Sequence, residues 1–475
     1  MAQVGLKTLD GKQHVVSEEA LDALRKGLRG KVLLPGDTGY DEARTIWNAM
    51  IDRKPAIIVS AADAADVARA VQFAREHQLL VAIRGGGHNI AGNAVCEGGL
   101  MIDLTPMKTI RLDPKARTAY VEPGVTLGEF DKEAQAHGLA TPLGINSTTG
   151  VAGFTLGGGF GWISRKYGLT IDNLISVDIV TADGKLVSAS EKENPDLFWA
   201  VRGGGANFGV VTAFEFRLHP VGPEVIAGLI VHPFANAKEL LEGYRKFVAN
   251  APDEVTAWVV LRKAPPLPFL PPEVPGKEVL VFAVCAVGDK AAAEKAVAPL
   301  RALGKPIADV VGPSPFVGWQ TAFDPLLAPG ARNYWKSHDF KKLDDGFFKV
   351  LIDGVNTLPG PECEIFLGHL GGAVNRVKAD ATAYPHRDVE FIMNIHTRWR
   401  DTAQDKGFIE WTRKVFDAAG AFATGGVYVN FMPEDEGQRV AKGAYGPNHE
   451  RLAKLKAKYD PANLFRMNQN IKPAS

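Results

Sequence analysis

The chain of 475 residues contains only three cysteines, at positions 96, 285 and 363. They are far apart and no C-x-x-C pair occurs, so the sequence supports neither a zinc ribbon nor a disulfide framework. The chain also lacks an excess of charge, because 54 Lys and Arg residues balance 54 Asp and Glu residues. The bulk composition therefore carries no basic footprint for nucleic acid, and we expect no nucleic-acid partner.

Long hydrophobic runs are missing as well. No stretch is long enough to span a bilayer, and the N-terminal residues 1–13 lack the apolar core of a signal peptide. We therefore expect no membrane partner and a cytoplasmic location.

The common nucleotide and hydrolase motifs are also absent. The dinucleotide fingerprint needs the spacing G-x-G-x-x-G, but windows that begin at Gly85, Gly157 and Gly203 all carry a bulky residue at the sixth position. No Walker A lysine, H-E-x-x-H or G-x-S-x-G motif occurs. An NAD-dependent dehydrogenase is disfavoured, and any nucleotide would bind through another arrangement of backbone amides.

Glycine, in contrast, is abundant, with 50 residues. Much of it falls in three clusters, at 85–99, 144–161 and 202–209, and each cluster borders a strand-like run. Flexible linkers are also glycine-rich, but these clusters are interleaved with Val, Ile, Phe and Trp. The clusters are either tight turns or places where the backbone approaches a ligand closely.

The first glycine cluster follows a βαβ-like pattern. Residues 55–59 predict a buried strand, Ser60 is expected to cap a helix with one apolar face, and residues 79–83 predict the next strand. The sequence Arg-Gly-Gly-Gly-His at 84–88 follows that strand at its carboxyl end. Open α/β sheets usually bind ligands at this end of their strands.

The residue pattern changes near Val221, where the glycine clusters stop. From 222 to 425, strands and helical stretches alternate, which predicts a second α+β domain with a largely antiparallel sheet. The Pro-rich run 264–272 is expected to be an extended loop or a lid. The last stretch, 426–475, is expected to contain a helix near 449–459. The domain limits are therefore 40–221, 222–425 and 426–475.

Three separated segments together carry a family resemblance. They are the Arg-Gly-Gly-Gly-His loop with its extension at 84–103, the glycine-rich segment 144–173, and the C-terminal segment 445–470 with its closing Asn-Gln-Asn. In this order they resemble the vanillyl-alcohol-oxidase type of flavoproteins, specifically the berberine-bridge-enzyme-like branch. The resemblance runs from about residue 40 to the end of the chain.

This resemblance implies an α+β, two-domain flavoprotein. Its discontinuous FAD-binding domain would combine 40–221 with 426–475, and the inserted substrate domain, with an antiparallel sheet plus helices, would be 222–425. The implied activity is that of an FAD-dependent oxidase or dehydrogenase. It would move a hydride from a small organic substrate, an alcohol, amine or sugar-like molecule, to flavin N5, and then electrons to O₂ or another acceptor. A non-catalytic flavin-binding protein is the alternative.

Glycine loops suit the pyrophosphate of FAD, because successive backbone amides form anion-binding concavities. The resemblance further implies that His88 is bound covalently to the 8α-methyl carbon of the flavin. Some relatives make a second bond through a Cys, but Asn146 stands at that position here, so a single bond is expected. The residues expected to hold the cofactor are Arg84, Gly85, Gly86, Gly87, His88, Asn89, Gly92, Pro123, Gly144, Ser147, Thr148, Thr149, Gly150, Gly153, Gly157, Gly158, Tyr167, Asp172, Tyr428, Asn430, Asn468 and Asn470.

Two residues are the catalytic candidates. Tyr428 lies in a segment that resembles the Tyr-x-Asn stretch of the family, and as a strand this segment would place Tyr428 and Asn430 on one face. Asn394 stands where plant relatives carry Gln or Glu, but an amide is no base, so Tyr428 is the leading candidate for proton removal. A phenolate would need a nearby donor or cation, for which Asn430 and Arg387 are the candidates. A packing role for Tyr428 remains the alternative.

Overall fold

The computed structural model describes residues 4–474. Its first half contains a four-stranded sheet of order β3-β4-β6-β5, in which β6 pairs in parallel with both β4 and β5. The elements of this part are β1 (Val4–Lys7), β2 (Gln13–Val16), α1 (Glu18–Gly27), β3 (Lys31–Leu33), α2 (Tyr40–Arg44), β4 (Ile57–Ser60), α3 (Ala64–Glu76), β5 (Val81–Arg84) and β6 (Leu100–Asp103). The βαβ pattern is thus confirmed, with β6 inserted between its two strands.

One detail of this unit was predicted wrongly. Asp63, rather than Ser60, caps helix α3, because its carboxylate accepts a hydrogen bond of 3.0 Å from the backbone N–H of Asp66. Ser60 instead ends strand β4. Strand β3 lies before residue 40 and yet pairs with β4. The domain limits themselves stay predictions.

A second sheet of the first half is antiparallel, with the order β11-β10-β12-β8-β7. Short helices connect it to the glycine loops. The elements of this part of the chain are β7 (Ile110–Asp113), β8 (Thr118–Val121), α4 (Leu127–Gln135), β9 (Leu139–Ala140), α5 (Val151–Leu156), α6 (Ser164–Tyr167), β10 (Leu174–Val180), β11 (Leu186–Ser190), α7 (Pro195–Val201), β12 (Val210–Arg217) and β13 (His219–Pro220). Strands β9 and β13 form a separate two-stranded sheet.

The other half of the molecule is built on one large sheet. Every pairing in it is antiparallel, as predicted, and its main order is β17-β14-β16-β15-β20-β21-β19. Its strands are β14 (Glu224–Pro233), β15 (Val255–Lys263), β16 (Glu278–Ala286), β17 (Ala308–Asp309), β18 (Gly312–Pro315), β19 (Arg332–Phe340), β20 (Glu364–His369) and β21 (Phe391–Trp399). Its helices are α8 (Ala237–Val248), α9 (Lys290–Arg301), α10 (Phe316–Gln320), α11 (Asp345–Val355), α12 (Ala373–Arg376) and α13 (Asp405–Ala419).

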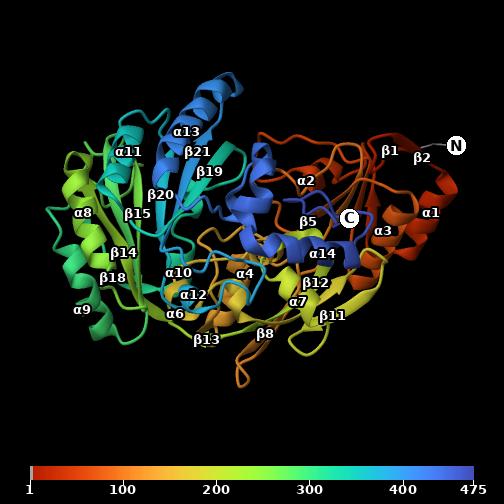
Figure 1. Ribbon diagram of the computed structural model, residues 1–475, viewed down its shortest axis with the longest axis horizontal. Helices are drawn as coiled ribbons and strands as arrows, with labels where there is room; N and C mark the ends of the chain where they lie inside the picture. Colours follow the sequence, from red (N-terminus) through yellow and green to blue (C-terminus); the bar gives the residue numbers. More distant parts are fainter. Residues whose placement is uncertain (1–3, 475) are drawn as a thin grey trace.

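Strand alternation gives this sheet two different faces. On β15, Ala257, Val259 and Leu261 belong to a hydrophobic core that also contains residues of α8, α9, α11 and α13. Trp258 and Val260 point the other way, into the core shared with the first half. Figure 1 shows α8 and α9 at the outer end of the molecule, so the inner face of the sheet is directed toward the first half.

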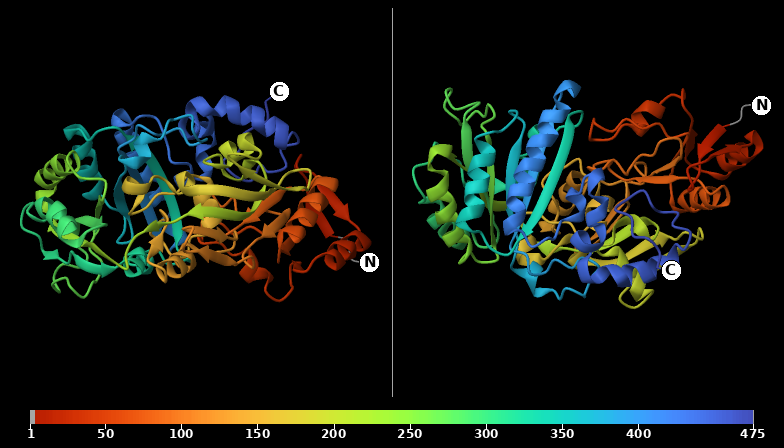
Figure 2. Two further views of the ribbon diagram at one scale, coloured as in Figure 1. Left: turned by 90° about the horizontal axis from the view of Figure 1, so that it is seen from below. Right: turned by 45° about the horizontal axis from the view of Figure 1, so that its top comes forward.

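The end of the chain returns to the first half. Figure 2 shows both termini at the same end of the molecule, and α14 (His449–Tyr459) packs against α7 there. The buried ammonium of Lys456 fixes this return, because it donates hydrogen bonds to the carbonyls of Asn207 and Phe465 and to the carboxylate of Asp460. The predicted C-terminal helix is confirmed.

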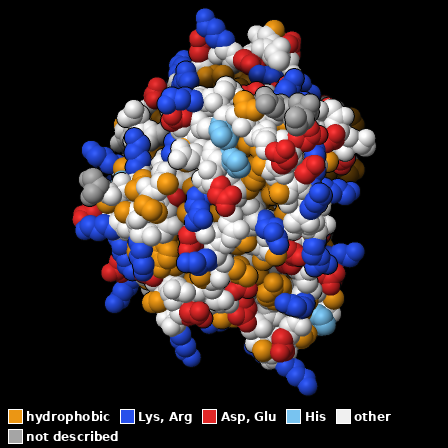
Figure 3. All heavy atoms as spheres, turned by 90° about the vertical axis from the view of Figure 1, so that its right-hand side faces the viewer, with side chains coloured by type: hydrophobic (Ala, Val, Ile, Leu, Met, Phe, Trp, Pro, Cys, Tyr) orange, Lys and Arg blue, Asp and Glu red, His pale blue; other side chains and the backbone are white. Residues whose placement is uncertain are grey.

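The surface agrees with the balanced composition. On the face that carries the N-terminal elements, Lys and Arg side chains are interspersed with Asp and Glu, and no large area has one sign (Figure 3). Within residues 4–474, no helix is long and apolar enough to cross a membrane.

Candidate active site

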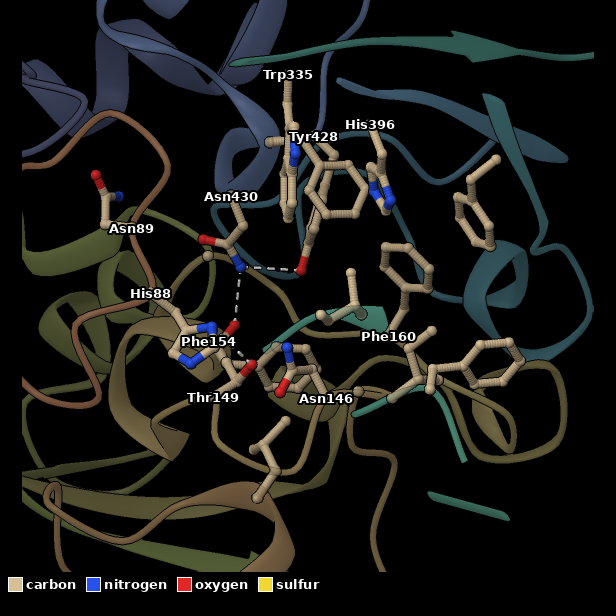
Figure 4. A pocket seen from close by; sticks show the side chains of 18 of the residues that line it. His88, Asn89, Asn146, Thr149, Phe154, Phe160, Trp335, His396, Tyr428 and Asn430 are labelled. Atoms are coloured by element: carbon tan, nitrogen blue, oxygen red, sulfur yellow. Dashed lines mark hydrogen bonds between the residues drawn. The ribbon is translucent and has the colours of Figure 1, made fainter. Parts of the chain in front are cut away.

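A cavity of about 320 Å³ lies between the inner face of the large sheet and the glycine loops. Its volume is within the range of ligand pockets. Its lining includes three separated parts of the chain: the glycine loops of the first half, the inner face of the sheet, and the segment that contains Tyr428 (Figure 4). The segments 84–103, 144–173 and 445–470, which carried the family resemblance, each contribute residues to the lining as well.

The two glycine loops touch each other beside this cavity. A Cβ atom on Gly86 would lie 2.2 Å from the backbone nitrogen of Gly150, and one on Gly150 would lie 2.2 Å from the nitrogen of Gly86. Any side chain at either position would overlap the opposite backbone. Gly153 differs, because a Cβ there would meet no atom within 4 Å.

His88 lies at the end of the first loop and faces the cavity (Figure 4). Its Nε2 lies 2.9 Å from the hydroxyl of Thr148, its Nδ1 lies 3.4 Å from the hydroxyl of Thr149, and its ring stacks on Trp47. Desolvation lowers the pKa of His88 to about 3. The imidazole is therefore uncharged at neutral pH and keeps the lone pair that a nucleophile needs.

Tyr428 is buried at the opposite side of the cavity, with Asn430 beside it (Figure 4). Its hydroxyl accepts hydrogen bonds of 2.9 Å from the backbone N–H of Gly159 and from Nδ2 of Asn430. The predicted strand is wrong, because Val429–Phe431 forms a 3-10 turn. The expected donor from Asn430 is nevertheless present.

Arg387 is not the cation that we expected beside Tyr428. Its guanidinium forms two hydrogen bonds, of 2.8 and 2.7 Å, with the carboxylate of Asp172, and another with Thr382. This buried ion pair joins the two halves of the molecule.

Thirteen of the predicted site residues line the cavity together. They are Gly85, Gly86, Gly87, His88, Asn89, Gly144, Thr149, Gly150, Gly153, Gly157, Tyr428, Asn430 and Asn468.

The other predicted residues lie outside the lining, and most of them support it. Several of their side chains contact other parts of the protein. Arg84 donates to the carbonyl of Ala43, Ser147 donates to Asp324, Thr148 contacts His88, Tyr167 stacks on His219, and Asp172 binds Arg387. A Cβ on Gly92 would meet Ile51, one on Gly158 would meet Tyr428, and one on Gly85 would meet the carbonyl of Pro123. Asn470 is also outside the lining, and its Oδ1 atom is buried without a partner.

Asn394 is the predicted catalytic residue that the structure does not bring to the cavity. It lies on β21, fully buried, and neither polar atom of its amide has a hydrogen-bond partner. Its cross-strand neighbour Phe366 lines the cavity instead. Asn394 therefore makes no direct contact with this space.

Sequence reasoning missed the polar residues of the sheet. Arg262, Glu364 and His396 line the cavity from three neighbouring strands, and Trp335 lines it from a fourth. Alternation along each strand could have shown which residues of that same strand lie on one face with each of these side chains. Only the cross-strand register brings them together.

Comparison with known proteins agrees with this architecture. Residues 55–190 match the family described as FAD binding domain, and residues 427–472 match berberine and berberine like. The chain is 31% identical to an FAD-linked oxidoreductase of Dictyostelium discoideum, over 98% of this chain and 99% of that protein. It is 30% identical to (R)-6-hydroxynicotine oxidase of Paenarthrobacter nicotinovorans, over 94% of this chain and 97% of that protein.

A solved structure is similar in three dimensions as well. The crystal structure of 6-hydroxy-D-nicotine oxidase from Arthrobacter nicotinovorans superimposes with a TM-score of 0.85, at 29% identity, and covers 94% of this chain and 98% of that chain. Chitooligosaccharide oxidase of Gibberella zeae is 29% identical over 92% of this chain and 91% of that protein.

The fold and the two matched regions define a two-domain flavoprotein that binds FAD. The chain belongs to the FAD-linked oxidoreductases of the berberine-bridge-enzyme-like branch, within the vanillyl-alcohol-oxidase type, and is an FAD-dependent oxidase or dehydrogenase.

The residues around the cavity fit this cofactor. Eight glycines line it, so along these stretches no side chain stands between the backbone and a bound group. The Oδ1 atom of Asn468, which lines the cavity, is buried without a partner, so it is free to accept a hydrogen bond from a bound group.

Proposed function

We propose that the protein holds FAD through one covalent bond to His88 and oxidises a small organic substrate, an alcohol, amine or sugar-like molecule. Bound FAD supplies a hydride acceptor at N5 and passes electrons on to O₂ or another acceptor. The single observation that supports this function best is the position of an uncharged His88 in the glycine-lined cavity, across from Tyr428 and Asn430.

In this proposal the residues of the chain have separate tasks. The loops around Gly86 and Gly150 would leave room for the pyrophosphate, and His88 would hold the flavin through one of its ring nitrogens. Tyr428 takes the proton that leaves the oxygen or nitrogen of the substrate. The large sheet closes the opposite side of the cavity and keeps water away from the reacting carbon. A cytoplasmic location remains a prediction from the sequence alone.

The linkage is tested by unfolding the protein in acid and asking where the flavin goes. We expect the colour to stay with the protein and one FAD to be found on the peptide that contains His88. His88→Ala should bind FAD that unfolding releases, whereas the control His137→Ala, at an exposed histidine, should keep its flavin attached. Flavin that stays bound in unfolded His88→Ala would contradict the assignment.

Catalysis itself is tested by anaerobic bleaching of the flavin with a panel of alcohols, amines and sugars. Bleaching by any of them separates the enzyme from a non-catalytic flavin-binding protein, which no substrate would reduce.

A further inference from the structure

The inner face of the large sheet carries one short row of polar side chains. Arg262 on β15 is the cross-strand partner of Glu364 on β20, and Glu364 is the partner of His396 on β21. Arg262 donates a hydrogen bond of 2.5 Å to Glu364, and Nδ1 of His396 lies 3.0 Å from the other carboxylate oxygen. All three residues line the cavity.

Glu364 in this row is an anion whose charge is already neutralised. Although burial alone raises its pKa, Arg262 and His396 lower the pKa of Glu364 to about 2. The ionised carboxylate accepts hydrogen bonds from Nδ1 of His396 and from the guanidinium of Arg262, and the pair of Arg262 and Glu364 carries no net charge. No other carboxylate among the described residues lines the cavity.

His396 offers the cavity one free acceptor. Because its Nδ1 proton is directed at Glu364, the lone pair lies on Nε2, and this buried atom has no hydrogen-bond partner. The ring is held between its neighbours, since it stacks on Trp335 at 4.4 Å between centroids. Figure 4 shows His396 beside Trp335 and Tyr428.

The rest of the sheet face that lines the cavity is apolar. Its side chains come from β14, β15, β16 and β20, and the Pro-rich loop adds Pro265, Leu267 and Leu270. The sheet residues include Leu229, Val231, Trp258, Val260, Val281 and Phe366.

We infer that the substrate is a neutral, largely apolar alcohol, whose hydroxyl donates a hydrogen bond to Nε2 of His396. The inference rests on the proposed function and narrows its substrate to one class. The apolar wall binds the hydrocarbon part of such a molecule, and the row of Arg262, Glu364 and His396 binds its polar end.

The other two substrate classes fit this surface poorly. A sugar would bring several hydroxyl groups against aliphatic side chains, and each hydroxyl that loses its water without a new partner lowers affinity by about tenfold or more. A protonated amine would need an unpaired anion, but Glu364 is already bound by Arg262 and His396.

Three probes of the same shape test this class. Cyclohexylmethanol, cyclohexylmethylamine and glucose each have a six-membered ring with one CH₂ arm that ends in a polar group. Cyclohexylmethanol is neutral and largely apolar, cyclohexylmethylamine is cationic at pH 7, and glucose carries several hydroxyl groups. Binding to the flavin-loaded protein is followed by quenching of tryptophan fluorescence, since Trp258 and Trp335 line the cavity. We expect cyclohexylmethanol to bind at least about tenfold more tightly than the other two.

Variants at His396 test the polar contact. His396→Phe keeps a flat ring and removes the acceptor, so binding of cyclohexylmethanol should weaken by about tenfold. His396→Gln keeps an acceptor and should retain most of the affinity. His137→Phe, at an exposed histidine outside the cavity, is the matched control and should bind as the parent does.

The results separate this inference from the proposed function. Equal or tighter binding of glucose or the amine, or unchanged binding in His396→Phe, would overturn the inference even if the flavin is covalent and is bleached. Selective binding of cyclohexylmethanol without bleaching by any member of the wider panel would support the binding preference of the cavity and overturn the proposed catalysis.

Discussion

Nδ2 of Asn430 lies 2.9 Å from the hydroxyl oxygen of Tyr428 and donates a hydrogen bond to it. The backbone N–H of Gly159 donates a second one. Burial raises the pKa of Tyr428 well above its usual range, and these two donors act in the opposite direction. Because both donors stabilise a phenolate more than a phenol, they offset part of the effect of burial, and proton removal by Tyr428 requires the phenolate that they stabilise.

Tyr428→Phe should therefore slow anaerobic flavin reduction by about 10²-fold or more, because positioned acid–base groups contribute about 10²–10⁴-fold in rate. Folding and flavin content should be kept, since the ring remains. Stopped-flow reduction with any substrate from the panel measures this rate across pH 6–10.

The control for this variant is Tyr445→Phe. Tyr445 is also buried and lines the cavity, but its hydroxyl donates to the carbonyl of Gly204 at 3.4 Å. We expect a much smaller effect on the rate. If Tyr428→Phe reduces its flavin as fast as the parent at every pH, Tyr428 is a packing residue and the base lies elsewhere.

The contact between the two glycine loops gives a prediction about stability. Gly86→Ala places a methyl group 2.2 Å from the backbone of Gly150, so one loop must move. Overpacking of this kind costs about 1–3 kcal/mol. We expect a lower thermal midpoint and less bound flavin, measured by thermal unfolding and by the absorbance of the purified protein.

Gly153→Ala is the matched control. It lies in helix α5, and a Cβ there meets no protein atom within 4 Å. Because Ala is more favourable than Gly in a helix by about 0.5–1 kcal/mol, the fold should be as stable as the parent or more so. A thermal midpoint that falls equally in both variants would show that the close approach of the loops is not what requires Gly86.

The sequence predicted the parts of the site that depend on neighbours along the chain. The Arg-Gly-Gly-Gly-His loop follows its strand as predicted, and Asn430 reaches Tyr428 from two residues away. The predicted strand at this place failed because the chain forms a 3-10 turn there, which still brings the two side chains together.

Contacts between distant residues could not be predicted in the same way. Arg387 seemed available to Tyr428, but its partner Asp172 lies 215 residues away. The row of Arg262, Glu364 and His396 likewise depends on the register of three strands, which one sequence does not reveal. In the sequence, nothing distinguishes these three residues from exposed polar residues, because they become buried only when the sheet is assembled.

Asp131 gives a prediction about pH and stability. It is buried on α4, and one carboxylate oxygen accepts a hydrogen bond of 2.9 Å from Gln320 on α10, while the other has no partner. Burial raises the pKa of Asp131 from 3.8 to about 7, although the bond from Gln320 lowers it. The folded protein therefore binds a proton that the unfolded chain releases at a lower pH.

This difference makes the contribution of Asp131 to stability fall as pH rises. Between about pH 4 and pH 7 the folded state holds more protons than the unfolded state, so the free energy of unfolding decreases through this window and levels off above it. From pH 5 to pH 8 the loss should be about 3 kcal/mol for this group.

The variant Asp131→Asn tests this dependence, because it cannot ionise and its amide oxygen can still accept the bond from Gln320. We therefore expect the stability gained by Asp131→Asn over the parent to be larger at pH 8 than at pH 5, by urea unfolding. Asp417→Asn, at an exposed position, should show no such dependence. A gain that is equal at both pH values would mean that Asp131 is already ionised in the folded protein at pH 5.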